Sequence, residues 1–125
     1  SGGAWEYVAG YVNNGHGNLT NYGSSLVNGD AKTKNVYSKA SSDSYENNYN
    51  ANSSKYGDAV YETSTNGSGS TSWYGDYSYF PNTSFPFFSR GGYYNDGTLA
   101  GVFYFNYGSG YSNSDYSFRP VLVAL

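Results

Sequence analysis

The clearest strand pattern in the chain lies in its C-terminal third, between Ser89 and Leu122. Asp96-Gly97 is typical of a tight hairpin turn, because glycine adopts positive φ freely and aspartate tolerates it. The residues on both sides are rich in Tyr, Phe and Val, as strands are. The sequence therefore predicts a β-hairpin over residues 89–106 and a closing strand over residues 118–122.

The alternation in the second half of this hairpin predicts which side chains face the interior. Phe103 and Phe105 are two residues apart and share one face of a strand that begins at Val102. We expect both phenylalanines to point inward and to meet Trp5 and Phe118 in a common core. That packing would leave the tyrosines and amides near the C-terminus at the surface.

The N-terminal half of the chain has one strong element followed by weak patterning. Residues 5–12 predict a central strand, because apolar side chains fall on both of its faces. Turn residues at 13–18 end it. From 19 to 55 we expect only loop or short helix, with Asp43 and Glu46 allowing one short capped turn.

The middle of the chain predicts irregular structure. Residues 57–63 indicate a short strand or turn-strand unit, and residues 65–71 form a Gly/Ser tip that we expect to be mobile. Residues 73–88 hold the densest group of aromatic rings and two prolines. Because proline interrupts helices, this group predicts an irregular lid whose rings pack on the sheet.

The length of the chain limits the number of domains, and its composition limits the classes of partner. A chain of 125 residues is at most one domain, and its 21% aromatic content favours folding over disorder. The net charge of -3 and six scattered Lys and Arg residues argue against nucleic acid and against direct membrane contact. The absence of Cys and Met suits an exposed extracellular protein.

Two motifs at opposite ends of the chain resemble one superfamily. The first motif, Ser1-Gly2-Gly3-Ala4-Trp5-Glu6-Tyr7, is similar to the superfamily's Gly-Asn-x-Trp-Glu-Trp motif. The second, Arg90-Gly91-Gly92-Tyr93 followed by Phe118-Arg119, resembles the C-terminal half of the superfamily's fold. The superfamily is that of formylglycine-generating enzymes and sulfatase-modifying factors, a variety of the C-type-lectin-like fold. The nearest resemblance is to secreted, pilin-like and diversity-generating-retroelement-variable proteins of Firmicutes.

The resemblance implies an α+β fold that is loop-rich and mostly β. In the superfamily, helices and a first strand precede the Trp-Glu motif. The resemblance therefore implies that residues 1–125 are a single binding domain, the C-terminal portion of a larger protein, without the N-terminal helical part of the fold. An open sheet edge would then be covered by residues 19–55 or by a partner chain.

The resemblance does not extend to the superfamily's known enzymes. Formylglycine-generating enzymes use a pair of cysteines, which this chain lacks, and iron-dependent members use a histidine motif, whereas His16 is alone. We expect His16 to be a solvated loop residue. Paired carboxylates, Asp58 with Glu62 or Asp76 with Asp96, leave a degenerate hydrolase as an alternative.

The same resemblance implies a calcium site at the start of the chain. Its ligands would be the carbonyls of Gly2 and Ala4 and the carboxylate of Glu6, since Ca²⁺ takes several hard oxygens. The alternative is that Glu6 is a buried acceptor that holds neighbouring loops. For Arg90 and Arg119 we expect a structural role, in which they donate hydrogen bonds to loop carbonyls.

Tyrosines, amides and carboxylates cluster toward the C-terminus and form the candidate binding face. Tyr, Asn, Ser and Gly are typical of adaptable binding surfaces, because Tyr offers a large contact area at low entropic cost. In the retroelement-variable proteins that the chain resembles, the segment before Phe-Arg is the ligand-binding face. The candidate residues are Tyr93, Tyr94, Asn95, Asp96, Tyr104, Asn106, Tyr107, Tyr111, Asn113 and Asp115.

These observations predict a non-catalytic ligand-binding or adhesion module, extracellular or on a bacterial cell surface. Its partner would be a protein or a glycan on another cell or surface. Two alternatives remain open at this point. One is a structural subunit of an extracellular filament or pilus that self-associates through exposed tyrosines, and the other is a degenerate enzyme of the superfamily.

Overall fold

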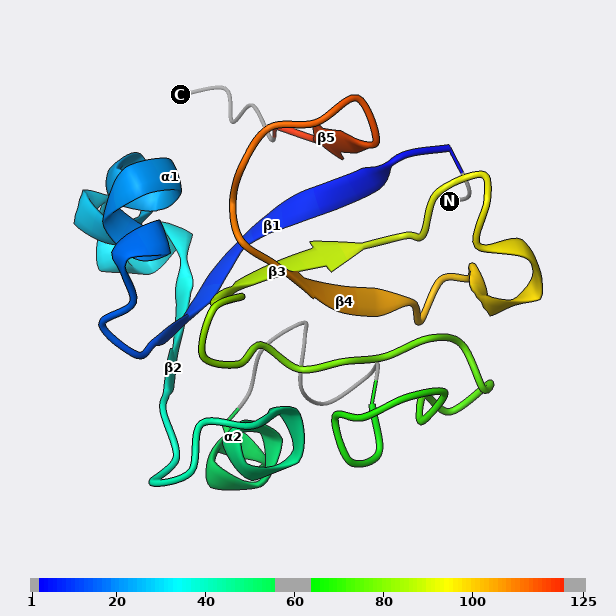
Figure 1. The fold of residues 1–125 in the computed structure, drawn as a ribbon, viewed down its shortest axis with the longest axis horizontal. Helices are drawn as coiled ribbons and strands as arrows, with labels where there is room; N and C mark the ends of the chain where they lie inside the picture. The colour runs from blue at the N-terminus through cyan, green and yellow to red at the C-terminus, as the bar shows by residue number, and fades with distance from the viewer. Residues whose placement is uncertain (1–2, 56–63, 121–125) are drawn as a thin grey trace.

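The computed structural model describes residues 3–55 and 64–120 and shows a mixed, mostly β fold (Figure 1). Within these residues, an open five-stranded sheet is accompanied by two α-helices and two short 3-10 helices. The strands are β1 (Trp5–Asn13), β2 (Asn35–Ser38), β3 (Phe87–Arg90), β4 (Phe105–Gly108) and β5 (Tyr116–Phe118). The helices are α1 (Gly17–Asn28), η1 (Ala31–Thr33), α2 (Tyr45–Asn52) and η2 (Gly97–Leu99).

Strand β1 lies at the centre of the sheet, as its sequence predicts. Its N-terminal half pairs in parallel with β5, and its C-terminal half pairs in parallel with β2 along the same edge. Its other edge pairs antiparallel with β3, which in turn pairs antiparallel with β4. The N-terminal end of β1 therefore lies between β5 and β3.

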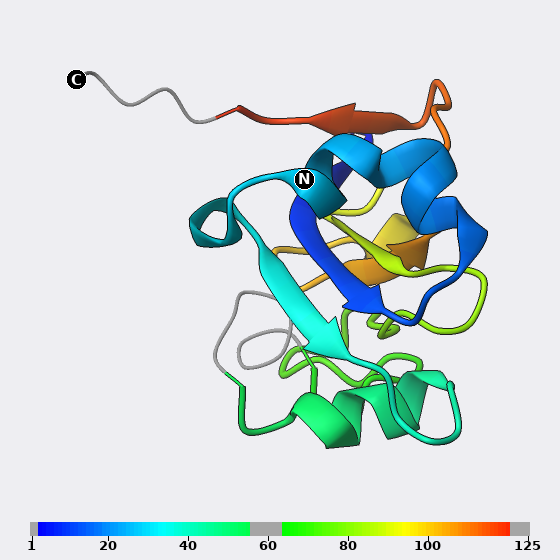
Figure 2. The same cartoon turned by 90° about the vertical axis from the view of Figure 1, so that its left-hand side faces the viewer.

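Two separate cores cover the two faces of the sheet. Along β1, consecutive side chains alternate between faces, so Tyr11 and Val12 enter different cores. The core toward α2 contains Val12, Tyr37, Phe80, Phe88 and Phe105, and the core toward α1 contains Tyr11, Leu19 and Phe87. Figure 2 shows α1 toward one side of the sheet and α2 toward the other.

The sequence predicts loop or short helix over residues 19–55, and both α-helices arise in or beside this range. His16 is the N-cap of α1, and its ring Nδ1 accepts a hydrogen bond from the Asn18 N–H at 3.1 Å, so it is not merely a solvated loop residue. Ser44, rather than Asp43, caps α2. The residues are weak helix formers, and α1 is stabilised mainly by packing Leu19 and its neighbours against the sheet.

The predicted hairpin exists, but its connection is long. Strands β3 and β4 pair antiparallel, yet β4 begins at Phe105 instead of Val102, and residues 91–104 form the link. Asp96 precedes η2 and has a negative φ of -74°, whereas Gly97 has a φ of +60°. The tight-turn prediction is therefore wrong in detail. The closing strand β5 ends at Phe118, and the end of the predicted closing strand, at 121–122, lies outside the described residues.

The predicted core is correct for only one of its four aromatic residues. Phe105 is fully buried, but Trp5 and Phe103 are half-buried and Phe118 is 79% exposed. Phe103 lies before β4 begins, so the alternation of a strand does not govern it. Its ring stacks on Tyr74 at 4.8 Å instead.

Residues 64–81 pack against the α2 face more closely than their composition predicts. The carbonyls of Gly67 and Gly69 accept hydrogen bonds from the N–H groups of Phe80 and Ser78 at 2.8 and 2.7 Å. Gly67 has a φ of +78°, and a Cβ there would lie 2.6 Å from Cβ of Tyr49. The backbone of the tip at Gly67 and Gly69 is thus held by hydrogen bonds to residues 78–80 and packs closely against α2. The predicted strand at 57–63 lies outside the described residues.

Candidate ligand-binding site

A continuous row of aromatic rings crosses the N-terminal end of β1. Successive ring centroids lie 5.4 Å apart from Tyr94 to Tyr93, 4.1 Å from Tyr93 to Trp5 and 5.1 Å from Trp5 to Tyr116. The ring of Tyr116 also stacks on Tyr7 at 4.6 Å and meets Tyr111 at 6.1 Å. We call this set, Tyr94, Tyr93, Trp5, Tyr116, Tyr7 and Tyr111, the aromatic row.

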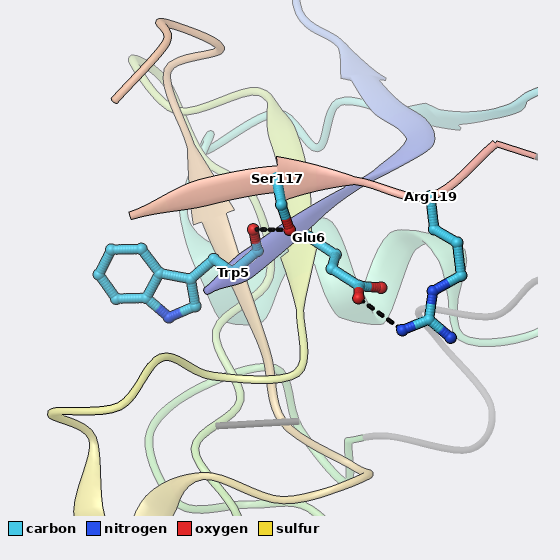
Figure 3. A network of polar contacts seen from close by, with 4 residues as sticks. All are labelled: Trp5, Glu6, Ser117 and Arg119. Atoms are coloured by element: carbon cyan, nitrogen blue, oxygen red, sulfur yellow. Dashed lines mark hydrogen bonds and ion pairs between the residues drawn. The ribbon is translucent and has the colours of Figure 1, made fainter. Parts of the chain in front are cut away.

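The sheet positions the centre of the aromatic row. Trp5 and Tyr7 are two residues apart in β1 and share the face toward α1, and Tyr116 of β5 lies opposite Trp5 in register. Figure 3 shows the indole of Trp5 pointing away from Glu6 and Arg119. The row therefore belongs to one face of the sheet.

Two loops bring the ends of the aromatic row beside this face. The Tyr94 N–H donates to the Gly3 carbonyl at 3.1 Å, which fixes the loop after β3 next to the start of β1. At the other end, the Tyr7 hydroxyl donates to the Tyr111 carbonyl at 3.3 Å and accepts from the Gly110 N–H at 3.2 Å. At the first end, the side chain of Tyr94 is 77% exposed and meets solvent.

A shallow cleft of about 300 Å³ lies at the Tyr111 end of the row. Its apolar walls come from tyrosines of the row and from the exposed ring of Phe118, and its polar residues include Ser112 and Asn113. Such a combination of rings with a few polar groups can bind a ligand by stacking and hydrogen bonding.

Three of the predicted binding residues support the row from behind. The Trp5 Nε1 donates to Asp96 Oδ2 at 3.1 Å and to the Tyr104 hydroxyl at 2.8 Å. Asp96 Oδ2 also accepts from the Tyr93 N–H at 2.8 Å, and Asn106 Nδ2 donates to the Tyr104 hydroxyl at 3.4 Å. Tyr104 is buried. The predicted binding residue Tyr104 thus lies behind the exposed rings, and its hydroxyl bonds to Trp5 and Asn106 inside the protein.

Burial changes the acidity of the phenols in and behind the row. Burial raises the pKa of Tyr7, Tyr104 and Tyr116 above the ordinary value of a tyrosine, and neighbouring phenols or Asp96 add to the shift. The Tyr7 hydroxyl uses its proton in the bond to the Tyr111 carbonyl, and the Tyr104 hydroxyl is bonded to Trp5 and Asn106, so these two hydroxyls hold the row in place.

The remaining predicted residues are divided between two places. Tyr107 lies toward the α2 face, between Tyr45 at 5.2 Å and Phe85 at 4.8 Å, and burial raises its pKa to about 12. Asn95, Asn113 and Asp115 lie beside the aromatic row. The Asn113 carbonyl accepts from the Tyr116 N–H, and the Asp115 carbonyl accepts from the Trp5 N–H.

Sequence reasoning missed the centre of the row. It assigned Trp5 to the core and did not select Tyr7 or Tyr116. The spacing of Trp5 and Tyr7 in a strand could have placed both on one face. No local pattern indicates that β5 pairs with β1, so the position of Tyr116 could not be predicted.

The described residues include only two of the three predicted calcium ligands, the Ala4 carbonyl and the Glu6 carboxylate. The Glu6 carboxylate already pairs with Arg119, with 2.7 Å between Oε1 and Nη2. Gly2 lies outside the described residues, and across residues 3–55 and 64–120 no three His, Cys, Asp or Glu side chains gather in one place. Ca²⁺ takes six to eight oxygen ligands, so a site here would need further oxygens and would compete with Arg119 for the Glu6 carboxylate. The calcium site stays a prediction.

Two of the four carboxylates proposed for a hydrolase, Asp76 and Asp96, are used in structural contacts. Asp76 Oδ2 accepts from the Phe103 N–H at 3.1 Å, and Asp96 holds the loop around Tyr93. Asp58 and Glu62 lie outside the described residues. Asp76 and Asp96 thus hold residues 91–104 in place.

Comparisons of the chain with protein-family models, with curated proteins and with solved structures found no significant match. Among the helices that the structure describes, none has the length and apolar character needed to cross a membrane.

Proposed function

We propose that this protein is a non-catalytic, extracellular ligand-binding module of a bacterium and that the aromatic row is its contact surface. The observation that supports this function is the unbroken contact of exposed and half-buried rings from Tyr94 to Tyr111. Aromatic and tyrosine-rich surfaces bind proteins and glycans alike, because each ring combines a large apolar face with a polar group.

The proposal includes the C-type-lectin-like fold. The mixed, loop-rich sheet and the position of the Trp-Glu motif at the start of a central strand support it. In this structure Trp5 and Glu6 point to opposite faces of the sheet, so the motif serves two surfaces (Figure 3).

Loss of the exposed tyrosines at the two ends of the row is expected to weaken ligand binding. Glycan and protein arrays would first identify a ligand, and calorimetry would then compare the wild type with Tyr94→Ala and Tyr111→Ala. We expect the double variant to bind at least about tenfold more weakly, because exposed tyrosines at binding surfaces often contribute more than 1 kcal/mol.

Tyr74→Ala is the matched control for this experiment. Tyr74 is 75% exposed, close to the value for Tyr94, but its ring stacks on Phe103 instead of the row. Tyr74→Ala should bind as the wild type does. Full affinity in the double variant, or equal losses in all variants, would place the site elsewhere.

A second candidate function is self-association as a subunit of a filament. It is favoured by an exposed apolar patch formed by Trp73, Tyr74, Val102 and Phe103, in which the rings of Trp73 and Tyr74 stack on Phe103 at 6.3 and 4.8 Å. Exposed patches of this kind often mark protein interfaces.

Light scattering over a range of concentrations tests self-association. If the patch is an interface, the mean mass should rise with concentration in the wild type and in Tyr94→Ala, and Tyr74→Ala should suppress the increase. A strict monomer at high concentration would argue against the filament, and it would leave ligand binding by the row intact.

A further inference from the structure

On the face of the sheet opposite the indole of Trp5, a polar cleft lies across three strands. Ser117 of β5, Glu6 of β1 and Arg90 of β3 are neighbours in register. Arg119 follows the end of β5, and its ion pair with Glu6 at 2.7 Å places its guanidinium on the same face. Figure 3 shows Glu6 and Arg119 meeting on the side away from the indole.

These residues line a cleft of about 480 Å³. Its floor includes Glu6 and Val8 of β1, and its walls include Arg90, Val102, Ser117 and Arg119. Gly3, Ala4 and Gly91 complete its lining and add no side chain beyond a methyl group. The cleft is therefore large enough for a small polar group and carries two cations against one anion.

Most of the donors of Arg90 have no partner in the described part of the protein. Its guanidinium makes one long hydrogen bond, from Nη2 to the Val102 carbonyl at 3.5 Å. Although Arg90 is the cross-strand neighbour of Glu6, the Glu6 carboxylate pairs with Arg119 instead. A guanidinium carries five N–H donors, so most of the Arg90 donors are available to a ligand in the cleft that this side chain lines.

The pair between Arg119 and Glu6 is open to exchange. The Arg119 side chain is 76% exposed, and ion pairs in such exposed positions contribute little to stability. An incoming anion could take the Arg119 donors without a large loss. This differs from the structural role that the sequence predicts for both arginines, because Arg119 contacts a carboxylate rather than loop carbonyls, and Arg90 reaches only one carbonyl.

We propose that this cleft binds an oxyanion, such as the carboxylate of a ligand, between the guanidinium groups of Arg90 and Arg119, with Glu6 as the internal competitor for Arg119. The planar fork of a guanidinium matches the two oxygens of a carboxylate, which is why arginine binds such groups in bidentate fashion. The site lies on the other face from the aromatic row and does not depend on ligand binding there.

NMR titration of the isotope-labelled protein with sodium acetate and, separately, sodium sulfate tests this site. Ionic strength is held constant with sodium chloride, so that screening alone does not move the signals. We expect saturable shifts of amide signals around the cleft, at Gly91 and Ser117, in at least one of the two titrations. Acetate alone would identify a carboxylate site, and sulfate would identify a broader oxyanion site.

Three variants change the expected affinity for the oxyanion, two by lowering it and one by raising it. Arg90→Gln should weaken binding by about tenfold or more, because hydrogen bonds in which both partners are charged are stronger than neutral ones. Arg119→Gln, at an exposed position, should weaken binding without affecting folding. Glu6→Gln should strengthen binding several-fold, because it frees Arg119 and removes a competing charge.

Tyr94→Ala is the control, and it should bind the oxyanion as the wild type does. Equal affinities in the wild type, Arg90→Gln and Arg119→Gln would overturn the proposal, as would weaker binding in Glu6→Gln. Shifts that sodium chloride alone reproduces would also overturn it. None of these results would affect the test of the aromatic row, which uses a different face and different variants.

Discussion

Phe88→Ala should lower the free energy of unfolding by about 4 kcal/mol, because it removes a ring from the centre of the core toward α2. Phe88 is fully buried, and its ring centroid lies 5.2 Å from Tyr37, 5.0 Å from Phe80 and 5.8 Å from Phe105. These rings come from different segments of the chain, so the cavity would weaken several of them at once. Chemical denaturation followed by circular dichroism measures the change.

Phe118→Ala is the control for the same side-chain truncation. Phe118 is almost entirely exposed, so its loss should change the free energy of unfolding by less than about 0.5 kcal/mol. The comparison also separates the observed core from the one that the sequence predicts. A loss at Phe118 as large as that at Phe88 would contradict the structure.

Asn48→Ala should lower the free energy of unfolding by about 3 kcal/mol, because it leaves buried backbone groups without partners. Asn48 of α2 is fully buried, its Oδ1 accepts from the Ala40 N–H at 2.8 Å, and its Nδ2 donates to Asp43 Oδ1 at 2.6 Å and to the Pro81 carbonyl at 3.0 Å. One amide thereby joins α2 to two loops. Thermal and chemical denaturation measure the effect.

Asn50→Ala provides the matched comparison within the same helix. Its side chain is exposed, and alanine is the better helix former, so the variant should be as stable as the wild type or slightly more stable. If both asparagines gave the same small effect, the bonds of Asn48 to the loops would not contribute to folding as the structure indicates.

Residues with strong local patterns were predictable. The central position of β1 follows from apolar side chains on both faces, and the antiparallel pairing of β3 with β4 follows from two aromatic segments around a turn. The helices were not, because α1 and α2 consist largely of Asn, Ser, Tyr and Gly. Their stability comes from contacts with distant strands, which no short window of sequence contains.

The candidate site shows the same division. Tyr93, Tyr94 and Tyr111 were identifiable from composition, because tyrosines in a polar loop favour a binding surface. Tyr104 was not distinguishable from them, although it is buried behind Trp5. In a chain with 17 tyrosines, local composition alone does not separate a ring that meets solvent from one that supports it.

The amino-acid sequence by itself determined a mostly β protein with a central strand near its start and a tyrosine-rich composition with few charged residues. Tertiary structure alone decided that β5 lies beside β1, which puts Tyr116 against Trp5 and Tyr7 and sets Arg119 against Glu6. The reason is physical. Alternation along a strand sets which side chains share a face, but the neighbours that approach from far along the chain decide which face meets water.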